Sequence, residues 1–330
     1  MAELRFKNRS LPLQPYESVL DCLLRNGEHL PYACKAGMCQ ACLIRAVDCE
    51  ATPESRKWIK PALQARGYTL ACQWVPEGDV AAEVPAIEEF SVAARIDSLA
   101  VLNERVMRVC LRPEDPARMF AYRPGQYLTL INPAGLARSY SIANDYEAEG
   151  FIELHIASTT HGEFTQWLFT KAQSGMMLHM RGPAGECHYA NIDGDSHPLL
   201  LAGTGTGLAP LYGIARDALQ RGHRGEINLY HGGRTTAQLY YVDELRALAL
   251  AHPNFHYHGC VSDTGAAAGL LQGRLEPLVE KGLDSSAIAQ TQAYLCGAPE
   301  FVHAMRKRLF LKGLRSANIH CDPFTERTVV

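Results

Sequence analysis

Three cysteines stand close together near the start of the chain, at Cys34, Cys39 and Cys42, within the stretch PYACKAGMCQACLIRA. Thiolates at such spacings bind metals or carry redox chemistry, and each kind of site demands its own pattern. Covalent haem attachment requires C-x-x-C-H, but Leu43 follows Cys42; a zinc ribbon requires two C-x-x-C pairs, and this stretch has one. A thioredoxin-like dithiol would leave Cys34 without a role. None of these sites uses all three cysteines.

The spacing C-x4-C-x2-C, followed at a distance by a fourth cysteine, is the plant-type pattern that holds a 2Fe-2S cluster. Cys34, Cys39 and Cys42 match this pattern, and Cys72 in YTLACQW is the fourth ligand that it predicts. A loop wrapped tightly around a cluster needs small residues. This loop has them at Ala33, Ala36, Gly37 and Ala41.

The residues around the cysteines predict the elements that must position them. ELRFKN and LPLQPY read as a pair of short strands, and Ser18 can cap a helix VLDCLLRN that ends at Gly27. Strand, strand, helix and cluster loop follow one another in the order of a β-grasp ferredoxin. Residues 1 to about 85 therefore resemble plant-type ferredoxins, and the resemblance implies a β-grasp fold around a 2Fe-2S cluster.

Composition limits what the rest of the chain can be. The chain has 330 residues, 47% of them hydrophobic, which is enough for two or three domains. A net charge of -3 lacks the basic footprint of a nucleic-acid binder, and no apolar run approaches the about 18 residues of a membrane span. Eleven cysteines, an odd number, argue against a disulfide framework. We expect a cytoplasmic protein without a membrane span or a nucleic-acid partner.

Short strand patterns with Gly and Pro between them follow a linker-like stretch, VPEGDVAAEVPAIEEF. They predict a small antiparallel barrel. The patterns are FSVAARIDSLAV, ERVMRVCLRP, QYLTLINP, FIELHIAS and MMLHMRGP.

Within this region, ARSYSIAN carries residue types that suit a flavin. A flavin site needs a cation for the pyrophosphate, an aromatic face and a hydroxyl near the reacting ring atoms, and Arg138, Tyr140 and Ser141 supply them. Gly162 and Thr165 open a helical pattern, where free N–H groups and the helix dipole attract phosphate. With RPGQYLTL, these residues resemble the flavin-binding signature of the ferredoxin–NAD(P)+ reductase superfamily. The resemblance implies FAD, with FMN left open, and places Ser141 at the catalytic centre.

A buried strand, a glycine turn, a helix and a second buried strand read in order from residue 196 to 235. This is a βαβ unit, and nucleotides bind at the carboxyl end of its strands. The turn G-T-G-T-G-x-A-P resembles the superfamily's nicotinamide domain, which makes its five leading residues a cofactor site: Gly203, Thr204, Gly205, Thr206 and Gly207. Arg234 in HGGRT can reach a 2′-phosphate, but we expect NADH, with NADPH left open.

The stretch AYLCGAPEFVHAM resembles the superfamily's strand-end Cys-Gly-x-Pro motif. The resemblance implies that Cys296, with Gly297 beside it, lies where hydride passes from nicotinamide to flavin. A small thiol there would exclude water and allow close approach of the two rings. In the final segment HCDPFTE, the resemblance places Phe324 near the flavin.

We therefore expect a multidomain chain of the α+β and α/β classes. It comprises a β-grasp ferredoxin (1–88), an antiparallel FAD-binding barrel (89–194) and a parallel-sheet NAD(P)-binding domain (195–330). This order resembles the single-chain reductase components of bacterial multicomponent oxygenases. It implies an oxidoreductase that passes electrons from NADH through FAD and 2Fe-2S to an oxygenase or hydroxylase component. A reductase for a deoxysugar dehydrase, or a redox sensor without significant turnover, are the alternatives. Lys35, Ala36 and Met38 are candidates for the surface that an acceptor meets.

Overall fold

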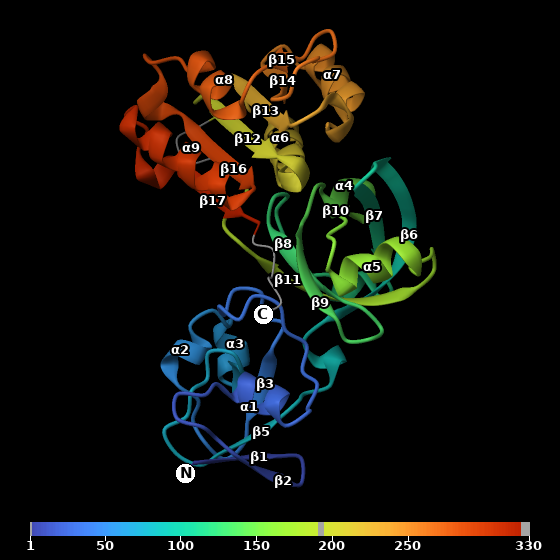
Figure 1. Ribbon diagram of the computed structural model, residues 1–330, viewed down its shortest axis with the longest axis vertical. Coiled ribbons are helices and arrows are strands. Elements are labelled where there is room, and N and C mark those ends of the chain that lie inside the picture. The colour runs from blue at the N-terminus through green and yellow to red at the C-terminus, as the bar shows by residue number, and fades with distance from the viewer. Residues whose placement is uncertain (1, 191–194, 325–330) are drawn as a thin grey trace.

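Three β-sheets follow one another along the chain and along the long axis of the molecule (Figure 1). The computed structural model describes residues 2–190 and 195–324. The N-terminal sheet and the C-terminal sheet lie at opposite ends, and the middle sheet separates them. None of the helices in these ranges reaches the length and hydrophobicity that a bilayer crossing requires.

The N-terminal domain is a five-stranded mixed sheet in the order β2-β1-β5-β3-β4. The Ser18 hydroxyl accepts a hydrogen bond from the backbone N–H of Asp21 at 3.1 Å and so caps the first helix. The capped helix predicted from the sequence is confirmed. The predicted strand pair is also present, but its second strand is Arg9–Pro12 and not residues 11–16. Its elements are β1 (Glu3–Phe6), β2 (Arg9–Pro12), α1 (Val19–Arg25), β3 (Leu43–Ala46), α2 (Pro53–Arg56), α3 (Pro61–Gln64), β4 (Tyr68–Leu70) and β5 (Val80–Glu83).

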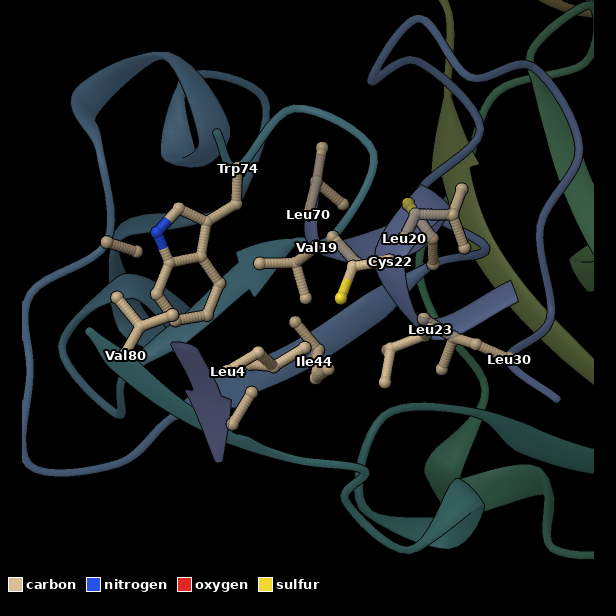
Figure 2. Packing of buried hydrophobic residues seen from close by; sticks show 14 of the residues in the cluster. Leu4, Val19, Leu20, Cys22, Leu23, Leu30, Ile44, Leu70, Trp74 and Val80 are labelled. Atoms are coloured by element: carbon tan, nitrogen blue, oxygen red, sulfur yellow. The ribbon is translucent and has the colours of Figure 1, made fainter. Parts of the chain in front are cut away.

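One apolar core holds this small domain together. It gathers side chains from the sheet and from α1 (Figure 2), with Trp74, Leu4 and Ile44 all less than 2% exposed. Burying side chains of this size stabilises a fold by roughly 1.5–3 kcal/mol each. The core therefore fixes the sheet from which the cysteine loop between α1 and β3 projects.

The sequence predicts a linker over residues 75–90, and this prediction is wrong for residues 80–83. Val80–Glu83 forms β5, which pairs in parallel with β1 and antiparallel with β3 inside the sheet. The run Val-Ala-Ala shows no alternation because both faces of the strand are covered, and its three residues are at most 9% exposed. The connection to the next domain is the shorter stretch that follows, with a 3-10 turn at Ile87–Glu89.

The middle domain is a six-stranded sheet in the order β10-β7-β6-β11-β8-β9, with every pair antiparallel. A bridge between Ile142 and Leu154 joins its two edges, so the sheet closes into the predicted barrel. Its elements are β6 (Val92–Asn103), β7 (Val106–Pro113), β8 (Tyr127–Ile131), β9 (Ala137–Ser141), α4 (Tyr146–Glu149), β10 (Ile152–Ala157), α5 (Glu163–Thr170) and β11 (Met177–Ala184).

The C-terminal domain is an all-parallel sheet in the order β15-β14-β13-β12-β16-β17, as the βαβ pattern predicts. Strand β12 is buried over most of its length, and α6 packs on the sheet. Its elements are β12 (Leu199–Thr204), α6 (Leu208–Gln220), β13 (Ile227–Gly233), α7 (Val242–Ala251), β14 (Phe255–Val261), β15 (Leu271–Gln272), α8 (Leu275–Gly282), β16 (Gln292–Gly297), α9 (Pro299–Leu311) and β17 (Ile319–Pro323).

A buried carboxylate joins the barrel to the C-terminal domain. Glu153 on β10, 2% exposed, accepts hydrogen bonds from Arg108 at 2.6 Å and Tyr241 at 2.8 Å, and its other contact is the His155 ring at 2.8 Å. His155 in turn contacts the Tyr240 hydroxyl at 3.1 Å. Burial by itself raises the pKa of Glu153, but the hydrogen bonds outweigh it and lower the pKa to about 2.

Replacing Glu153 by Gln should lower the free energy of unfolding near pH 7 by about 3 kcal/mol, because the Arg108 cation loses its counter-charge. The folded-state pKa lies below the ordinary value of 4.5. The carboxylate therefore stabilises the fold fully above pH 4.5 and loses that contribution as the pH falls toward 2. Urea denaturation near neutral pH and in acid measures the difference, which should shrink in acid.

The matched control is Glu114→Gln in the same barrel. Glu114 pairs with Arg95 at 3.2 Å, but the two side chains are 43% and 51% exposed, and exposed pairs contribute less than about 1 kcal/mol. Equal losses in the two variants would contradict a special role for Glu153.

Candidate functional site

The four predicted cluster cysteines come together as two pairs of thiols. Cys39 donates to Cys34 and Cys42 donates to Cys72, and charge interactions link the pairs to each other. The hydrogen bond from Cys39 lowers the pKa of Cys34 to about 5, and the bond from Cys42 lowers the pKa of Cys72 to about 7. The same contacts, with burial, raise the pKa values of Cys39 and Cys42.

Backbone N–H groups surround these sulfurs, as a negatively charged cluster requires. The backbone N–H groups of Ala36 and Cys39 both donate to Cys34 Sγ, at 3.3 Å and 3.4 Å respectively. Gly37, at φ +81°, turns its N–H toward Cys72. Over residues 2–190 and 195–324, no three His, Cys, Asp or Glu side chains converge on one metal position. The pairing of the four thiols fits a cluster in which each of two adjacent irons has two thiolate ligands.

The barrel holds the cluster loop by three consecutive carbonyl oxygens. Tyr127 donates its hydroxyl to the Met38 carbonyl at 3.1 Å, Thr129 donates to the Cys39 carbonyl at 2.8 Å, and Arg181 donates to the Gln40 carbonyl. We call Tyr127, Thr129 and Arg181 the carbonyl clamp. Tyr127 and Thr129 are two residues apart on β8, and Arg181 on β11 is the register partner of Thr129, so alternation puts all three on one face of the sheet.

A large cleft opens between the cluster loop, the barrel and the parallel sheet, with a volume of about 1690 Å³. Cluster cysteines, predicted flavin residues and predicted nicotinamide residues all line it. The predicted residues in its wall are Cys34, Cys39, Arg138, Tyr140, Ser141, Gly162, Thr165, Thr204, Gly205, Thr206, Arg234, Gly297 and Phe324. The fold therefore brings three separately predicted sites to one space.

The loop residues Ala36 and Met38 also line this cleft. Both are exposed, with Met38 56% exposed, so their place on the surface that an acceptor meets stays a prediction. Lys35 is also exposed, and its ammonium pairs with Asp21 at 2.5 Å.

The barrel side of the cleft offers the three groups that a flavin requires. Arg138 is half-buried and its guanidinium donates to the Ala137 carbonyl at 2.7 Å. The Tyr140 ring packs on Phe164 with centroids 5.6 Å apart, and burial raises the pKa of its hydroxyl. Ser141 donates to Asp322 at 3.2 Å. A cation, an aromatic face and a hydroxyl thus lie along one strand, β9, and these residues fit the isoalloxazine and pyrophosphate of FAD.

Asp322, on β17, is a cleft residue that the sequence analysis missed. Burial raises the pKa of its carboxyl to about 6 despite the hydrogen bond from Ser141. The segment HCDPFTE was recognised by resemblance, but nothing in its spacing says that Asp322 would meet a serine 181 positions away. The parallel pairing of β17 with β16 brings it there.

The first turn of α5 forms another part of the wall. Gly162 is the N-cap residue, and a Cβ there would lie 2.0 Å from the Thr159 hydroxyl. Thr165 donates to the Gly162 carbonyl at 3.0 Å and contacts Thr159 at 3.0 Å. This leaves a close approach to the backbone at a helix N-terminus, which suits a phosphate group. His161, to which the sequence analysis gave no role, also lines the cleft.

Glycines let the turns after β12 and β16 press against each other. A Cβ on Gly207 would lie 2.4 Å from the Cys296 carbonyl, and one on Gly203 would lie 2.7 Å from Leu211. Gly297 has φ +113°, and a Cβ there would lie 2.5 Å from the Thr204 carbonyl. Gly203 and Gly207 therefore lie on the side of the turn that packs against β16. Gly205 and its two threonine neighbours line the cleft.

The Cys296 side chain is not part of the cleft wall. It is fully buried, and its sulfur lies 3.6 Å from that of Cys187. Burial raises the pKa of this thiol well above its usual range. Its neighbour Gly297 does line the cleft, and the Gly297 carbonyl accepts a hydrogen bond from the N–H of Phe324 at 2.8 Å.

The fold and the cleft define a single-chain oxidoreductase with iron–sulfur, flavin and nicotinamide sites. Family models agree over most of the chain: a 2Fe-2S iron-sulfur cluster binding domain at residues 5–77, an oxidoreductase FAD-binding domain at 93–189 and an oxidoreductase NAD-binding domain at 201–307.

The naphthalene 1,2-dioxygenase system ferredoxin–NAD(P)+ reductase component of Pseudomonas putida is 32% identical over 96% of both chains. The crystal structure of the Amycolatopsis cytochrome P450 reductase GcoB superposes with a TM-score of 0.69 at 29% identity, over 99% of both chains. A CDP-6-deoxy-L-threo-D-glycero-4-hexulose-3-dehydrase reductase of Yersinia pestis is 27% identical over 93% of both chains. The chain belongs to this family of ferredoxin–NAD(P)+ reductases, in which a plant-type ferredoxin domain is fused to a flavin and nicotinamide module.

Gly207→Ala tests the close approach of the two turns. The added methyl group would meet the Cys296 carbonyl. We therefore expect the free energy of unfolding to fall by about 1–3 kcal/mol and the KM for NADH to rise. Thermal unfolding and steady-state kinetics measure the two effects. Gly78→Ala is the control, since a Cβ there meets no atom within 4 Å. A Gly207 variant that behaves like the Gly78 variant would refute the packing argument.

Proposed function

We propose that this protein passes electrons from NADH through FAD and a 2Fe-2S cluster, one at a time, to a separate oxygenase component. The observation that carries the proposal is the shared cleft, whose wall includes Cys34 and Cys39, the β9 flavin residues and the glycine turn after β12. Donor, flavin and cluster sites in one space permit transfer inside one molecule. The relatives named as reductase components of oxygenase systems support the choice of acceptor.

The proposal assigns each cofactor to residues that fit it. Cys34, Cys39, Cys42 and Cys72 hold the cluster. The flavin is held by Arg138, Tyr140, Ser141 and the start of α5 at Gly162 and Thr165, with Phe324 at the cleft. A flavin bound there takes up an electron pair as hydride and releases single electrons, which couples a two-electron donor to a one-electron acceptor. The glycine turn and Gly297 bind the nicotinamide nucleotide. The buried Cys296 packs against that turn and so fixes the position of Gly297 at the hydride site.

NADH is the proposed donor because Arg234 and Arg274, which line the cleft and could bind a 2′-phosphate, each lie beside a carboxylate. Arg234, which follows β13, lies 4.0 Å from Asp263, and Arg274 lies 3.4 Å from Glu276. Each arginine therefore has an acidic neighbour, and the acids repel an added phosphate.

We also propose domain boundaries at 1–88, 89–194 and 195–330, of which the boundary at 194 lies outside the described residues. The three sheets, which span residues 3–83, 92–184 and 199–323, support this division. A cytoplasmic location is part of the proposal, because NADH and reduced thiols are supplied there.

Cys72→Ser tests the path through the cluster. We expect the visible absorption of the 2Fe-2S centre to disappear and the FAD absorption to remain. NADH-dependent reduction of ferricyanide should persist, because ferricyanide can take electrons from the flavin directly. Cytochrome c reduction should fall by about tenfold or more, which corresponds to an increase of about 1.4 kcal/mol or more in the activation free energy. Cys49→Ser, which changes a half-buried cysteine outside the ligand set, is the control. An intact cluster spectrum in the Cys72 variant would refute the ligand assignment.

Parallel titration with NADH and NADPH tests the donor. We expect kcat/KM to be at least about tenfold higher for NADH, which corresponds to about 1.4 kcal/mol. The double variant Asp263→Asn, Glu276→Gln should raise kcat/KM for NADPH and leave that for NADH nearly unchanged. A preference for NADPH in the unaltered protein would overturn the assignment of the donor.

Reconstitution with an oxygenase encoded beside this protein tests the acceptor. NADH-dependent substrate oxidation should require both components. Activity restored only with a deoxysugar dehydrase would favour that alternative, and very slow reduction of cytochrome c or ferricyanide would favour a redox sensor.

A further inference from the structure

Arg181 is a buried cation at the boundary between the barrel and the cluster loop. Its side chain comes from β11 of the barrel, and the residue is 7% exposed. Its neighbours on β11, Leu178 and Met180, point into the barrel core. Alternation along the strand therefore turns Arg181 outward, toward the ferredoxin domain.

Among residues 2–190 and 195–324, Arg181 has no carboxylate partner. In the part of the chain that the structure describes, no Asp or Glu forms a salt bridge with it, and its Nε has no hydrogen-bond partner. Its guanidinium instead donates to the Gln40 carbonyl and lies 4.0 Å from the centre of the Phe90 ring. Gln40 itself adopts φ +53°, a conformation that residues with side chains seldom take.

Burial of an unpaired cation is unfavourable and lowers the pKa of Arg181 to about 10. The group therefore remains protonated at neutral pH. The groups that oppose this shift are the sulfurs of Cys42 and Cys39, which favour the cation when they are ionised, as cluster ligands are. These are cluster ligands in the proposed function, so the counter-charge of Arg181 is the cluster itself.

The clamp does not need a charge in order to hold the loop. Tyr127 and Thr129 make equivalent bonds to the neighbouring carbonyls with neutral hydroxyl groups. A neutral donor on β11 would avoid the cost of burying a cation. The charge of Arg181 therefore calls for an explanation beyond docking.

We propose that Arg181 is a positioning and potential-setting residue, which holds the Gln40 carbonyl and raises the reduction potential of the 2Fe-2S cluster. Reduction adds one electron, and so one negative charge, to a cluster that four thiolates already make negative. A buried cation nearby stabilises the reduced form more than the oxidised form. The electron comes from the NADH-fed flavin site, and Arg181 keeps its proton throughout. The inference thus rests on the proposed function.

Because Arg181 belongs to the barrel and the cysteines belong to the ferredoxin domain, the charge acts only while the two domains are docked. The carbonyl clamp makes that arrangement. Docking on the flavin domain therefore makes the cluster a better electron acceptor, and separation from it would make the cluster a stronger reductant.

Redox titration of the complete holoprotein, followed by the electron paramagnetic resonance signal of the reduced cluster, tests the proposal. Arg181→Gln keeps a hydrogen-bond donor and removes the charge. We expect its cluster potential to fall by about 59 mV or more, which corresponds to a tenfold or larger change in the one-electron equilibrium constant. Arg181→Met, of similar length and uncharged, should show the same fall. It serves as a second uncharged variant in case Arg181→Gln loses its cluster.

Two comparisons separate charge from docking. Arg181→Lys keeps a cation and should retain most of the potential. Thr129→Val removes a neutral clamp bond on the register partner and should change the potential by less than half as much as Arg181→Gln. An unchanged potential in both uncharged variants, or equal falls in Thr129→Val and Arg181→Gln, would overturn the proposal. Absence of a cluster from the unaltered protein would instead overturn the proposed function.

Discussion

The arrangement of the site depends on three hydrogen bonds to consecutive carbonyl groups. The cluster loop has little regular structure of its own, and the Met38, Cys39 and Gln40 carbonyls would need water if the barrel were absent. The carbonyl clamp satisfies all three from one face of β8 and β11. A small apolar contact, in which Cys39 and Ala41 pack on Ile131, excludes solvent beside it. Two cluster sulfurs consequently face the cleft where the flavin residues lie.

The barrel is the part that relates the other two domains to each other. Alternate residues of β8 face opposite ways: Leu128 and Leu130 fill the barrel core, whereas Tyr127 and Thr129 hold the cluster loop. On the other side, buried Glu153 binds Tyr241, next to α7 of the parallel sheet. One closed sheet thus supplies a core, a polar docking face and a charged interdomain contact. The barrel needs no additional element for these roles because a closed sheet leaves its outward-facing residues available.

Several parts of this protein could be predicted from the sequence because their signals are local. The cysteine spacing, the capped helix at Ser18, the glycine turn after β12 and the alternation of the barrel strands each depend on neighbouring residues. Strand β5 could not be predicted in the same way, because Val-Ala-Ala without alternation resembles a linker until both of its faces are seen to be covered. Asp322 and Arg181 carry no motif, and their partners lie on distant segments of the chain.

By itself the sequence determined the chemistry that each segment can carry: thiolates at iron–sulfur spacing, a cation, ring and hydroxyl for a flavin, and a glycine turn for a nucleotide. These are properties of residue type and short-range spacing. Only the tertiary structure decided that the segments share one cleft and that the Cys296 thiol is buried against Cys187 while Gly297 faces the cleft. It also decided that a barrel arginine contacts the cluster loop. The reason is physical. Relative position follows from strand pairing, from which face of a strand is buried and from interdomain hydrogen bonds, and these join residues that are far apart in the sequence.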